Sequence, residues 1–551
     1  MRKVISLFLI TCLIAVGFTA CGKSGQQGAK GSASNGKTAS TDKLNLLMGP
    51  EPDTIDPGFI LSSDGATYAL HVFEGLMRMG ADNKLQPGAA ESYDVSADKL
   101  TYTFHIRKDA KWSDGVPLKA QDFEYAWKRV LDPKTAAPYA YILYPVKNAQ
   151  ESLEGRVKVD QVGVKATDDR TFVVTLKAPT PYFLSICNFQ TTMPVRKDII
   201  EKNGDKWTQS PATYIGNGPY KLTAWKHKEA LDMTRNDNYW DAKSIAVKNI
   251  SWKLIEDDNA GLAAFESGDL DGILNRHVPA AEVANFIKQG RVKVHSASLG
   301  SDYFQIGLVK PSWNGVKDKR VRRALALAID RTALCDNILR TGNKPAGAYV
   351  PYGITEPDGR DFRDVGGNNF IPLKADVAEA KKLLADAGYP DGKGVPTLLY
   401  TYNTATRNQK VAEFLQEQWK KNLNIDVKIQ NQEWKVLIPD RTSHNFTLTR
   451  GGWTADYIDP MTFLDMFTKG SGNNDPGFDN AEYNALIAKA QNEPDEKKRM
   501  QIMHDAEKIL MEELPIIPLD FTVEYTMQKD NVKGIYTSPL GVVYAMHAKI
   551  T

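Results

Sequence analysis

Apolar residues in the first half of the chain follow the two-residue period of half-buried strands. The segments 99–106 (KLTYTFHI) and 171–176 (TFVVTL) alternate or run apolar and are bounded by Gly and Asp, which is typical of strands. Between them a helix is expected to begin near Lys119, with Asp122 in its positive first turn. Its buried face is predicted to consist of Phe123, Ala126 and Trp127. The first half is therefore predicted to be rich in strands.

Apolar residues in the second half recur instead at the three- and four-residue spacing of helices. This spacing predicts helices at 321–329, 377–387 and 408–423. Gly388 and Pro390 follow the second of them, which matches the glycine that ends many helices and the proline that cannot continue one. Strands are predicted at 425–429, 446–449 and 515–525. Helices that alternate with strands indicate an α/β lobe.

The N-terminus carries the pattern of an exported protein. A basic head precedes an apolar run at 4–18 that is too short to span a bilayer. Cys21 follows Phe-Thr-Ala, and this segment resembles the lipobox of bacterial lipoproteins, in which the cysteine is acylated and becomes the mature N-terminus. We predict a lipoprotein signal peptide at 1–20 and a flexible tether at 21–43, rich in Gly and Ser. An ordinary signal peptide with an incidental cysteine is the alternative.

Charge and cysteine content narrow the possible functions. Lys and Arg number 69 and Asp and Glu 67, so the chain without its basic head is close to neutral and offers no basic field for nucleic acid. Beyond Cys21, the cysteines are Cys187 and Cys335; two distant residues do not form a disulfide scaffold, and we expect two buried thiols. The eight histidines lie far apart without the spacing of a zinc site. Neither a metal nor another cofactor is expected.

One long segment resembles a known family signature. Residues 112–129 (WSDGVPLKAQDFEYAWKR) closely resemble the signature of the extracellular solute-binding proteins of family 5, the oligopeptide-binding proteins of ABC importers. That family usually starts the helix of this segment with Ser or Thr, where this chain has Lys119, so the helix cap is weaker. Further segments resemble the family in the same order: 51–57 (EPDTIDP), 73–76 (FEGL), 216–222 (GNGPYKL), 238–241 (NYWD), 320–325 (RVRRAL) and 431–435 (NQEWK).

The resemblance implies a three-lobed, periplasmic-binding-protein-like α/β fold of cluster C type. Two mixed α/β lobes and a smaller inserted lobe would enclose a ligand by hinge closure. A chain of this length also exceeds what one hydrophobic core supports, so more than one domain is expected. The implied lobes are lobe I at 44–86, 194–306 and 524–551, lobe II at 87–193, and lobe III at 307–523.

The stretch 450–460 (RGGWTADYIDP) has the most informative binding chemistry. We expect the strand at 446–449 to run into an aromatic turn that carries a cation, Arg450, and a carboxylate, Asp456. A buried carboxylate beside aromatic walls is costly unless a cation neutralises it. An internal salt bridge between Arg450 and Asp456 is one interpretation. The other is that the carboxylate binds a charged ligand.

The resemblance implies roles in peptide binding for this stretch. The ligand would lie extended between the lobes and pair with main-chain groups as an added strand. Asp456 would receive the α-ammonium group of the peptide, and Trp453 and Tyr457 would keep water away from that contact. Arg450 would bind a peptide carboxylate or support the site.

Four residues outside this stretch complete the candidate site. Tyr139 matches a ligand-contacting tyrosine of lobe II, and Glu74 matches an acidic residue near the cleft. Arg441 is a further candidate. Some oligopeptide binders use a histidine for the peptide C-terminus where this chain has Asn408, next to Arg407, so that end would be held differently. The alternatives are a core tyrosine for Tyr139 and helix-end charges for Glu74 and Arg441.

These observations predict a lipid-anchored, extracytoplasmic receptor that captures oligopeptides and delivers them to an ABC importer. Its partners would be the permease and ATPase subunits and the membrane, through the lipid on Cys21; it would act as a monomer at the cell surface or in the periplasm. A receptor for another solute (a dipeptide, a murein peptide, nickel or haem) or a peptide-pheromone sensor is the alternative. No GxSxG nucleophile motif occurs, and no enzyme is expected.

Overall fold

The computed structural model describes residues 42–49, 51–52, 54–80, 82, 84–295 and 298–551. The predicted signal peptide, Cys21 and nearly all of the predicted tether lie outside these residues. Strand β1 (Lys43–Gly49) is the first element described. Within the described part of the chain, no helix combines the length and the apolar character that a membrane span requires. Cys187 and Cys335 are both free and buried, as predicted.

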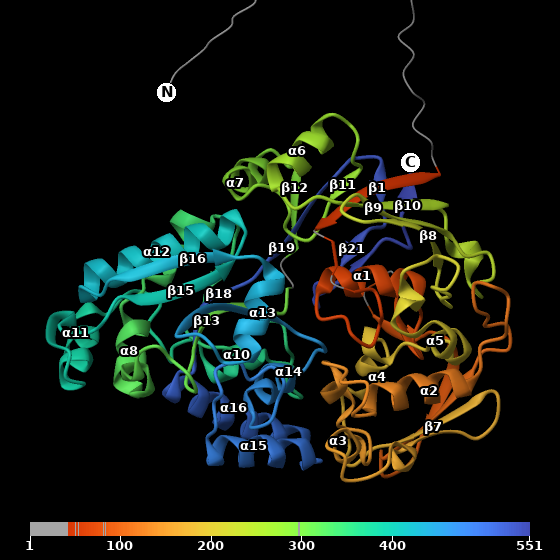
Figure 1. Ribbon diagram of the computed structural model, residues 1–551, viewed down its shortest axis with the longest axis horizontal. Helices are drawn as coiled ribbons and strands as arrows, with labels where there is room; N and C mark the ends of the chain where they lie inside the picture. Colours follow the sequence, from red (N-terminus) through yellow and green to blue (C-terminus); the bar gives the residue numbers. More distant parts are fainter. Residues whose placement is uncertain (1–41, 50, 53, 81, 83, 296–297) are drawn as a thin grey trace, which may run out of the picture. The chain divides into compact units, whose positions relative to one another are not determined.

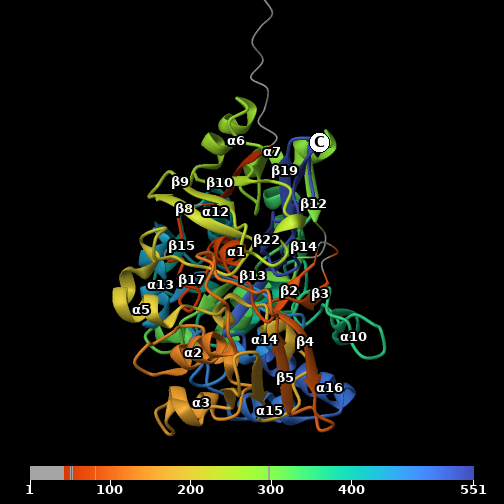
Figure 2. The ribbon, with the colours of Figure 1, turned by 90° about the vertical axis from the view of Figure 1, so that its right-hand side faces the viewer.

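A four-stranded antiparallel sheet lies within the range predicted for lobe II. Its order is β4-β5-β7-β6, with bounds Ala90–Val95, Thr101–Ile106, Thr171–Thr175 and Val164–Ala166. Helix α2 (Ala120–Leu131) packs against β6 and β7. Figure 1 shows α2 next to β7, and Figure 2 shows β4 and β5 of the same sheet. The predicted apolar face of this helix is buried, and the rings of Phe123 and Phe172 lie 6.0 Å apart. The Asp122 carboxylate accepts the Lys119 backbone N–H at 2.9 Å, which stabilises the helix start without a Ser or Thr cap.

A seven-stranded sheet joins segments that are far apart in the chain. Its order is β12-β19-β11-β1-β10-β9-β8, and the strands beyond β1 are β8 (Tyr220–Lys226), β9 (Ala230–Arg235), β10 (Asn249–Leu254), β11 (Gly272–Ile273), β12 (Val292–His295) and β19 (Glu524–Gln528). Strand β19, from the C-terminal part of the chain, thus lies between β11 and β12 and pairs with both. All of these strands fall within the three segments predicted for lobe I, apart from the first residue of β1.

A six-stranded mixed sheet organises the second half of the chain. Its order is β14-β18-β13-β17-β15-β16, with bounds Lys344–Pro345, Ile516–Phe521, Gly300–Ile306, Leu448–Thr454, Leu398–Asn403 and Val427–Gln432. Strand β13 pairs with β17 and β18, although the predicted boundary assigned residues up to 306 to lobe I. Sheet pairing therefore groups β13 with strands of the range predicted for lobe III. The lobe boundaries stay predictions.

The helices predicted in the second half are present with small shifts at their ends. They are α8 (Lys319–Leu327), α11 (Val377–Asp386) and α12 (Thr406–Leu423). Gly388 follows α11 with φ +96°, a conformation that favours glycine and confirms the predicted stop. Asn424 ends α12 in the left-handed region, so β16 starts at Val427, two residues later than predicted.

This half contains further helices. Among them are α10 (Phe362–Gly366), α13 (Trp434–Thr442), α14 (Met461–Leu464), α15 (Ala481–Asn492), α16 (Glu496–Glu513), the π-helical turn Leu334–Leu339 and the 3-10 turn Asp465–Phe467. In the first half, α1 (Ser63–Val72) and the 3-10 turn Ala140–Leu143 matter most for the site.

The segment 216–222, which resembles a family motif, has a structural explanation. A Cβ atom on Gly216 would lie 2.0 Å from the carbonyl oxygen of Val72, the last residue of α1. Gly218 donates its N–H to the same carbonyl at 2.8 Å. Only glycine permits this approach of two backbones. The motif therefore connects the end of α1 to strand β8, which begins at Tyr220.

Candidate ligand-binding site

Asp456 is a buried carboxylate that two tyrosine hydroxyls contact. Its side chain is 7% exposed. Tyr139 donates its hydroxyl to Oδ1 at 3.2 Å and Tyr141 donates to Oδ2 at 3.5 Å. The backbone N–H of Asp456 donates to Thr462 Oγ1 at 3.0 Å, which fixes the start of the loop. Both tyrosines belong to the segment around the 3-10 turn Ala140–Leu143, so residues far apart in the chain form one site.

Within the described part of the chain, no cation neutralises this carboxylate. No described Lys, Arg or His pairs with Asp456, and the charged group that acts on it is a second carboxylate, Asp465. Burial and then Asp465 raise the pKa of Asp456 well above its usual value, although the two tyrosine hydroxyls oppose this shift. Burial likewise raises the pKa of Asp465 to about 7. Such a group becomes favourable as an anion when a cation arrives from outside.

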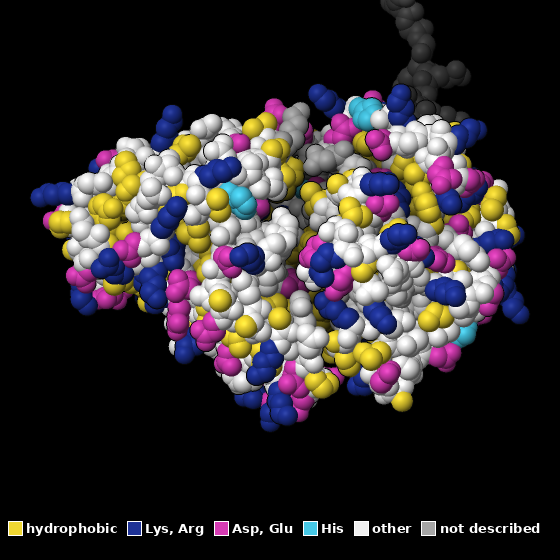
Figure 3. Space-filling view, turned by 60° about the horizontal axis from the view of Figure 1, so that its bottom comes forward, with side chains coloured by type: hydrophobic (Ala, Val, Ile, Leu, Met, Phe, Trp, Pro, Cys, Tyr) yellow, Lys and Arg dark blue, Asp and Glu magenta, His cyan; other side chains and the backbone are white. Residues whose placement is uncertain are grey.

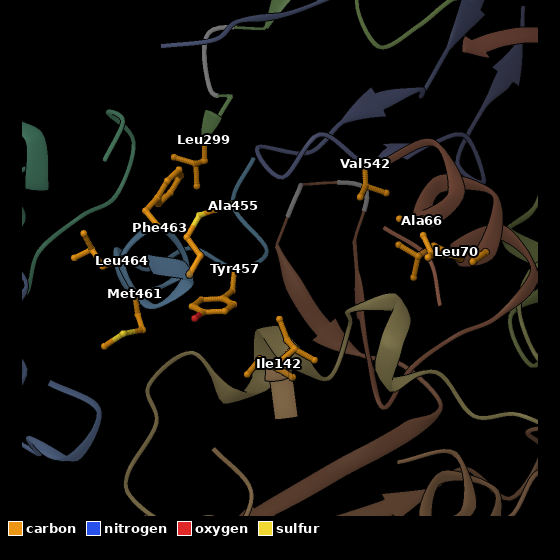
Figure 4. Packing of buried hydrophobic residues seen from close by; sticks show 14 of the residues in the cluster. Ala66, Leu70, Ile142, Leu299, Ala455, Tyr457, Met461, Phe463, Leu464 and Val542 are labelled. Carbon is orange, nitrogen blue, oxygen red and sulfur yellow. The ribbon is translucent and has the colours of Figure 1, made fainter. Parts of the chain in front are cut away.

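Several aromatic side chains pack together on the segments that form the Asp456 site. Tyr139 stacks on Tyr141 at 5.3 Å between ring centroids and lies 6.5 Å from Trp453. Tyr457 stacks on Tyr182 at 4.2 Å with the rings 4° from parallel. Figure 4 shows Tyr457 between Ile142 and the segment that carries Met461 and Phe463. These rings provide an apolar surrounding in which a charge–charge contact is stronger than in water.

A buried ion pair supports the loop that carries Asp456. Arg499 on α16 contacts both carboxylate oxygens of Asp459, at 2.7 and 2.8 Å. Asp459 also accepts the Met461 backbone N–H at 2.9 Å and so caps α14. Asp459 therefore stabilises the turn before α14 and anchors it to α16. Among the described residues, Asp459 has a cation partner and Asp456 does not.

The stretch 450–454 continues strand β17 and does not form the predicted turn. Pairing with β13 continues from Leu448 to Thr454, because the two glycines at 451 and 452 allow the side chains of Tyr303 and Asp302 to lie against the strand. Pairing with β15 involves only Leu448 and Thr449. Within the described residues, β17 therefore has an open edge from Arg450 to Thr454 on the β15 side. An open edge is a template for an added strand.

Arg450 does not pair with Asp456, so the internal salt bridge between these two residues is excluded. Its Nη2 donates to Asp302 Oδ1 on β13 at 3.1 Å, because residues 450 and 302 lie near each other across the β13–β17 ladder. Its Nε is buried and has no hydrogen-bond partner within the described part of the chain. A buried donor of this kind is rare in folded proteins unless a ligand or water satisfies it.

Glu74 and Arg441 lie in local charge networks. Glu74 is buried and accepts the Tyr239 hydroxyl and the Trp240 Nε1–H, the latter at 2.7 Å. Arg441 donates through Nε and Nη2 to Asp475 at 2.7 and 2.5 Å. Neither residue contacts the surroundings of Asp456, so their ligand contacts stay predictions.

Asn408 also makes local contacts. It lies in the first turn of α12 and donates its amide to the carbonyl and side-chain oxygens of Asn403, at 3.2 and 3.0 Å. Asn408 therefore joins the start of α12 to the end of β15. Its expected contact with the ligand is untested.

The sequence analysis missed two residues near the site, Tyr141 and Asp302. Tyr141 contacts Asp456 and also accepts the Asn473 amide at 2.8 Å. Asp302 contacts both Arg450 and Arg407, at 3.1 and 2.7 Å. Tyr141 could have been found as the second tyrosine of the segment that contains Tyr139. Asp302 could not, because its partners come from strands and helices more than a hundred residues away.

Comparison with known proteins agrees with the fold. The family model for bacterial extracellular solute-binding proteins, family 5 Middle, matches residues 84–475. The dipeptide-binding protein DppE and the oligopeptide-binding protein OppA of Bacillus subtilis are each 36% identical to this chain. The alignment with DppE covers 98% of this chain and the alignment with OppA covers 99% of it; each alignment covers 98% of the relative. The crystal structure of Haemophilus influenzae OppA in complex with RPPGFSPFR is 34% identical, covers 93% of this chain and 99% of its own, and has a TM-score of 0.84. The chain belongs to family 5 of the bacterial extracellular solute-binding proteins.

Proposed function

We propose that this protein captures oligopeptides in an extended conformation and delivers them to an ABC importer. The observation that carries the proposal is Asp456, a buried carboxylate that contacts two tyrosine hydroxyls and, within the described part of the chain, no cation. The α-ammonium group of a peptide is a cation of the right size for such a site. In the low-dielectric surroundings of Tyr139, Trp453 and Tyr457, their attraction exceeds that of an exposed pair.

The open edge of β17 supports the extended conformation. A peptide that pairs with residues 450–454 uses main-chain groups that every peptide carries, so affinity depends little on its side chains. Asp456 lies two residues beyond the end of this edge, so it would hold one end of the bound peptide. The relatives fit this proposal: DppE and OppA are named for binding dipeptides and oligopeptides, and the Haemophilus influenzae protein was crystallised with a peptide.

The importer and the membrane anchor complete the proposal. A receptor with no catalytic motif depends on partner permease and ATPase subunits for transport. Acylation of Cys21 would hold the protein at the outer face of the membrane, and the tether at 21–43 would let the body reach the permease. Peptide capture itself does not require the anchor.

Native mass spectrometry of the purified mature protein tests the proposed ligand. We expect additional masses that denaturation releases and sequencing identifies as a mixture of short peptides with free N-termini, because the main-chain contacts accept many sequences. A single released peptide would point to a dedicated receptor, such as a pheromone or murein-peptide binder. A sugar or metal mass in place of peptides would contradict peptide capture. If the purified protein carries no ligand, it is titrated with a mixed peptide library. Absence of binding would contradict peptide capture as well.

Replacement of Cys21 tests the anchor independently of the ligand. Cys21→Ser should move the protein from the membrane fraction to the soluble fraction and abolish the incorporation of labelled fatty acid, because the acylated thiol is lost. Cys187→Ser, which changes a buried thiol, is the control; it should leave the membrane association and the fatty-acid incorporation unchanged. Fatty-acid incorporation into the Cys21→Ser variant would show that the lipobox prediction is wrong.

A further inference from the structure

A cavity lies between helix α1 and the C-terminal part of the chain. Its lining includes apolar walls, formed by Leu70, Phe73 and Ile245, and polar groups, among them Arg78 and Tyr544. Figure 4 shows Leu70 of α1 near Val542, at the start of the C-terminal wall. Tyr139 and Tyr141, the tyrosines that contact Asp456, do not line this cavity. It is therefore a candidate for a second binding site.

Hydrogen bonds to α1 fix the C-terminal wall of this cavity. Strand β22 (Val543–Tyr544) packs on the helix, and Val543 donates its backbone N–H to Thr67 Oγ1 at 3.1 Å. Ala545 donates its backbone N–H to Nε2 of the buried His71, also at 3.1 Å. The cavity therefore has walls that are in place before a ligand binds.

The guanidinium group of Arg78 has one edge without a partner among the described residues. Arg78 lies on β2 (Met77–Met79), and its Nη1 donates to the Tyr239 hydroxyl and to Asp241 Oδ2, both at 3.0 Å. Its Nε is buried without a partner, and its Nη2 donates to no residue in the described part of the chain. A buried donor of this kind is rare unless water or a ligand satisfies it. Nε and Nη2 form an edge that matches the two oxygens of a carboxylate.

Tyr544 provides a second donor at the cavity. Its side chain is 3% exposed, and the Asn188 amide donates to its hydroxyl oxygen at 3.2 Å. The hydroxyl itself donates to no residue that the structure describes. Burial raises the pKa of Tyr544 to about 12, so the hydroxyl keeps its proton at neutral pH. The ring stacks on Tyr536 at 5.0 Å between centroids, which limits the movement of this donor.

The charges around Arg78 balance without a ligand. Glu74 accepts the Trp240 Nε1–H at 2.7 Å and lies 3.9 Å from Arg78 Nη1, and Asp241 pairs with the same nitrogen. The Arg107 guanidinium lies 3.7 Å from the centre of the Trp240 ring, so two guanidinium groups accompany two carboxylates. On the face drawn in Figure 3, Lys and Arg side chains lie among Asp and Glu side chains. A ligand would therefore gain affinity from directional hydrogen bonds and apolar contact rather than from net charge.

We propose that this cavity binds a small monocarboxylate with a short apolar tail. The carboxylate would accept hydrogen bonds from the free edge of Arg78 and from the Tyr544 hydroxyl. The tail would lie against Leu70, Phe73 and Ile245. The inference goes beyond the proposed function and does not depend on peptide capture.

Ligand-observed saturation-transfer NMR with sodium butyrate tests the site, at an ionic strength held constant with sodium chloride. We expect saturable binding. Butyramide, which has nearly the same shape and no charge, should bind at least roughly tenfold more weakly, because it lacks charge-assisted hydrogen bonds. A carboxylate can come from a free acid or from a peptide C-terminus, so the titration is repeated with saturating tri-alanine. Butyrate in this cavity should bind equally well in the presence of tri-alanine.

Arg78→Lys tests the hydrogen-bonding edge, because lysine keeps the positive charge and lacks the fork of donors. We expect it to weaken butyrate at least roughly tenfold, the scale of one hydrogen bond to a charged group. Tyr544→Phe removes the hydroxyl donor and keeps the ring that stacks on Tyr536, so it should weaken butyrate by a smaller factor. Arg156→Lys is the matched control, because Arg156 is exposed and pairs locally with Glu154. The melting temperature of each variant is measured in parallel.

The outcomes separate this site from peptide capture. Butyrate binding that survives tri-alanine and is lost in Arg78→Lys supports the site. The site is overturned if the wild type does not bind butyrate, if Arg78→Lys and Arg156→Lys bind it equally, or if tri-alanine displaces it. Should Arg78→Lys fail to fold, the comparison of Tyr544→Phe with Arg156→Lys decides in the same way. Peptide capture fails on a different result, the absence of binding of tri-alanine and of the mixed peptide library.

Discussion

Glu507→Ala should lower the free energy of unfolding by about 3–5 kcal/mol, the scale for breaking a buried ion pair by removing one partner. Glu507 on α16 and Arg363 in the short helix Phe362–Gly366 are both fully buried, and Arg363 donates to the two carboxylate oxygens at 2.6 and 2.8 Å. Glu507 also accepts the backbone N–H groups of Tyr349 and Val350, at 3.1 and 2.8 Å. Alanine would leave a guanidinium and two N–H groups buried without partners.

Urea unfolding followed by tryptophan fluorescence measures this loss. Glu512→Ala is the control on the same helix, because that side chain is 58% exposed and its pair with Lys508 spans 4.0 Å; it should change the stability by less than about 1 kcal/mol. The double variant Arg363→Met, Glu507→Leu should recover part of the loss, since an apolar pair leaves no buried charge. A loss for Glu507→Ala no larger than that of the control would contradict the importance of the pair.

Asp456→Asn should weaken peptides with a free α-amino group by roughly 2–5 kcal/mol, the scale for truncating one partner of a buried charge pair. The amide is close in shape to the carboxylate; its oxygen can accept one of the two tyrosine hydroxyls and its NH2 group can donate to the other, so the change removes mainly the charge. Because no internal cation contacts Asp456 in the described chain, we expect the variant to unfold at the same temperature as the wild type or higher. A loss of affinity without a loss of stability is the signature of a ligand-binding charge.

Calorimetric titration of N-acetylated and free peptides completes this test. The wild type should bind acetylated peptides poorly, and Asp456→Asn should reduce the difference between the two forms. Asp237→Asn is the control, because its carboxylate is 79% exposed and far from the site in the sequence; it should bind like the wild type. Equal affinity of the wild type for both forms would refute the assignment of Asp456 to the α-ammonium group.

The sequence by itself determined the family, most of the secondary structure and the central acidic residue. Helix α11 could be placed from its apolar spacing and from Gly388 beyond it, because short-range patterns control helix ends. Asp456, Trp453 and Tyr457 could be recognised because they lie within one stretch of the chain. The prediction of a turn at 450–454 was wrong, since glycine pairs in a strand resemble a turn when the partner strand is unknown.

Only the tertiary structure decided which groups neutralise one another. Arg450 and Asp456 are near each other in sequence, yet Arg450 pairs with Asp302, which is 148 residues away, because β13 lies beside β17 in the sheet. Tyr139 reaches Asp456 across a separation of 317 residues. Charge pairing depends on distances of a few ångströms in space, and no local pattern encodes which distant strands bring two side chains that close. The lack of a cation beside Asp456 among the described residues is therefore a property of the fold.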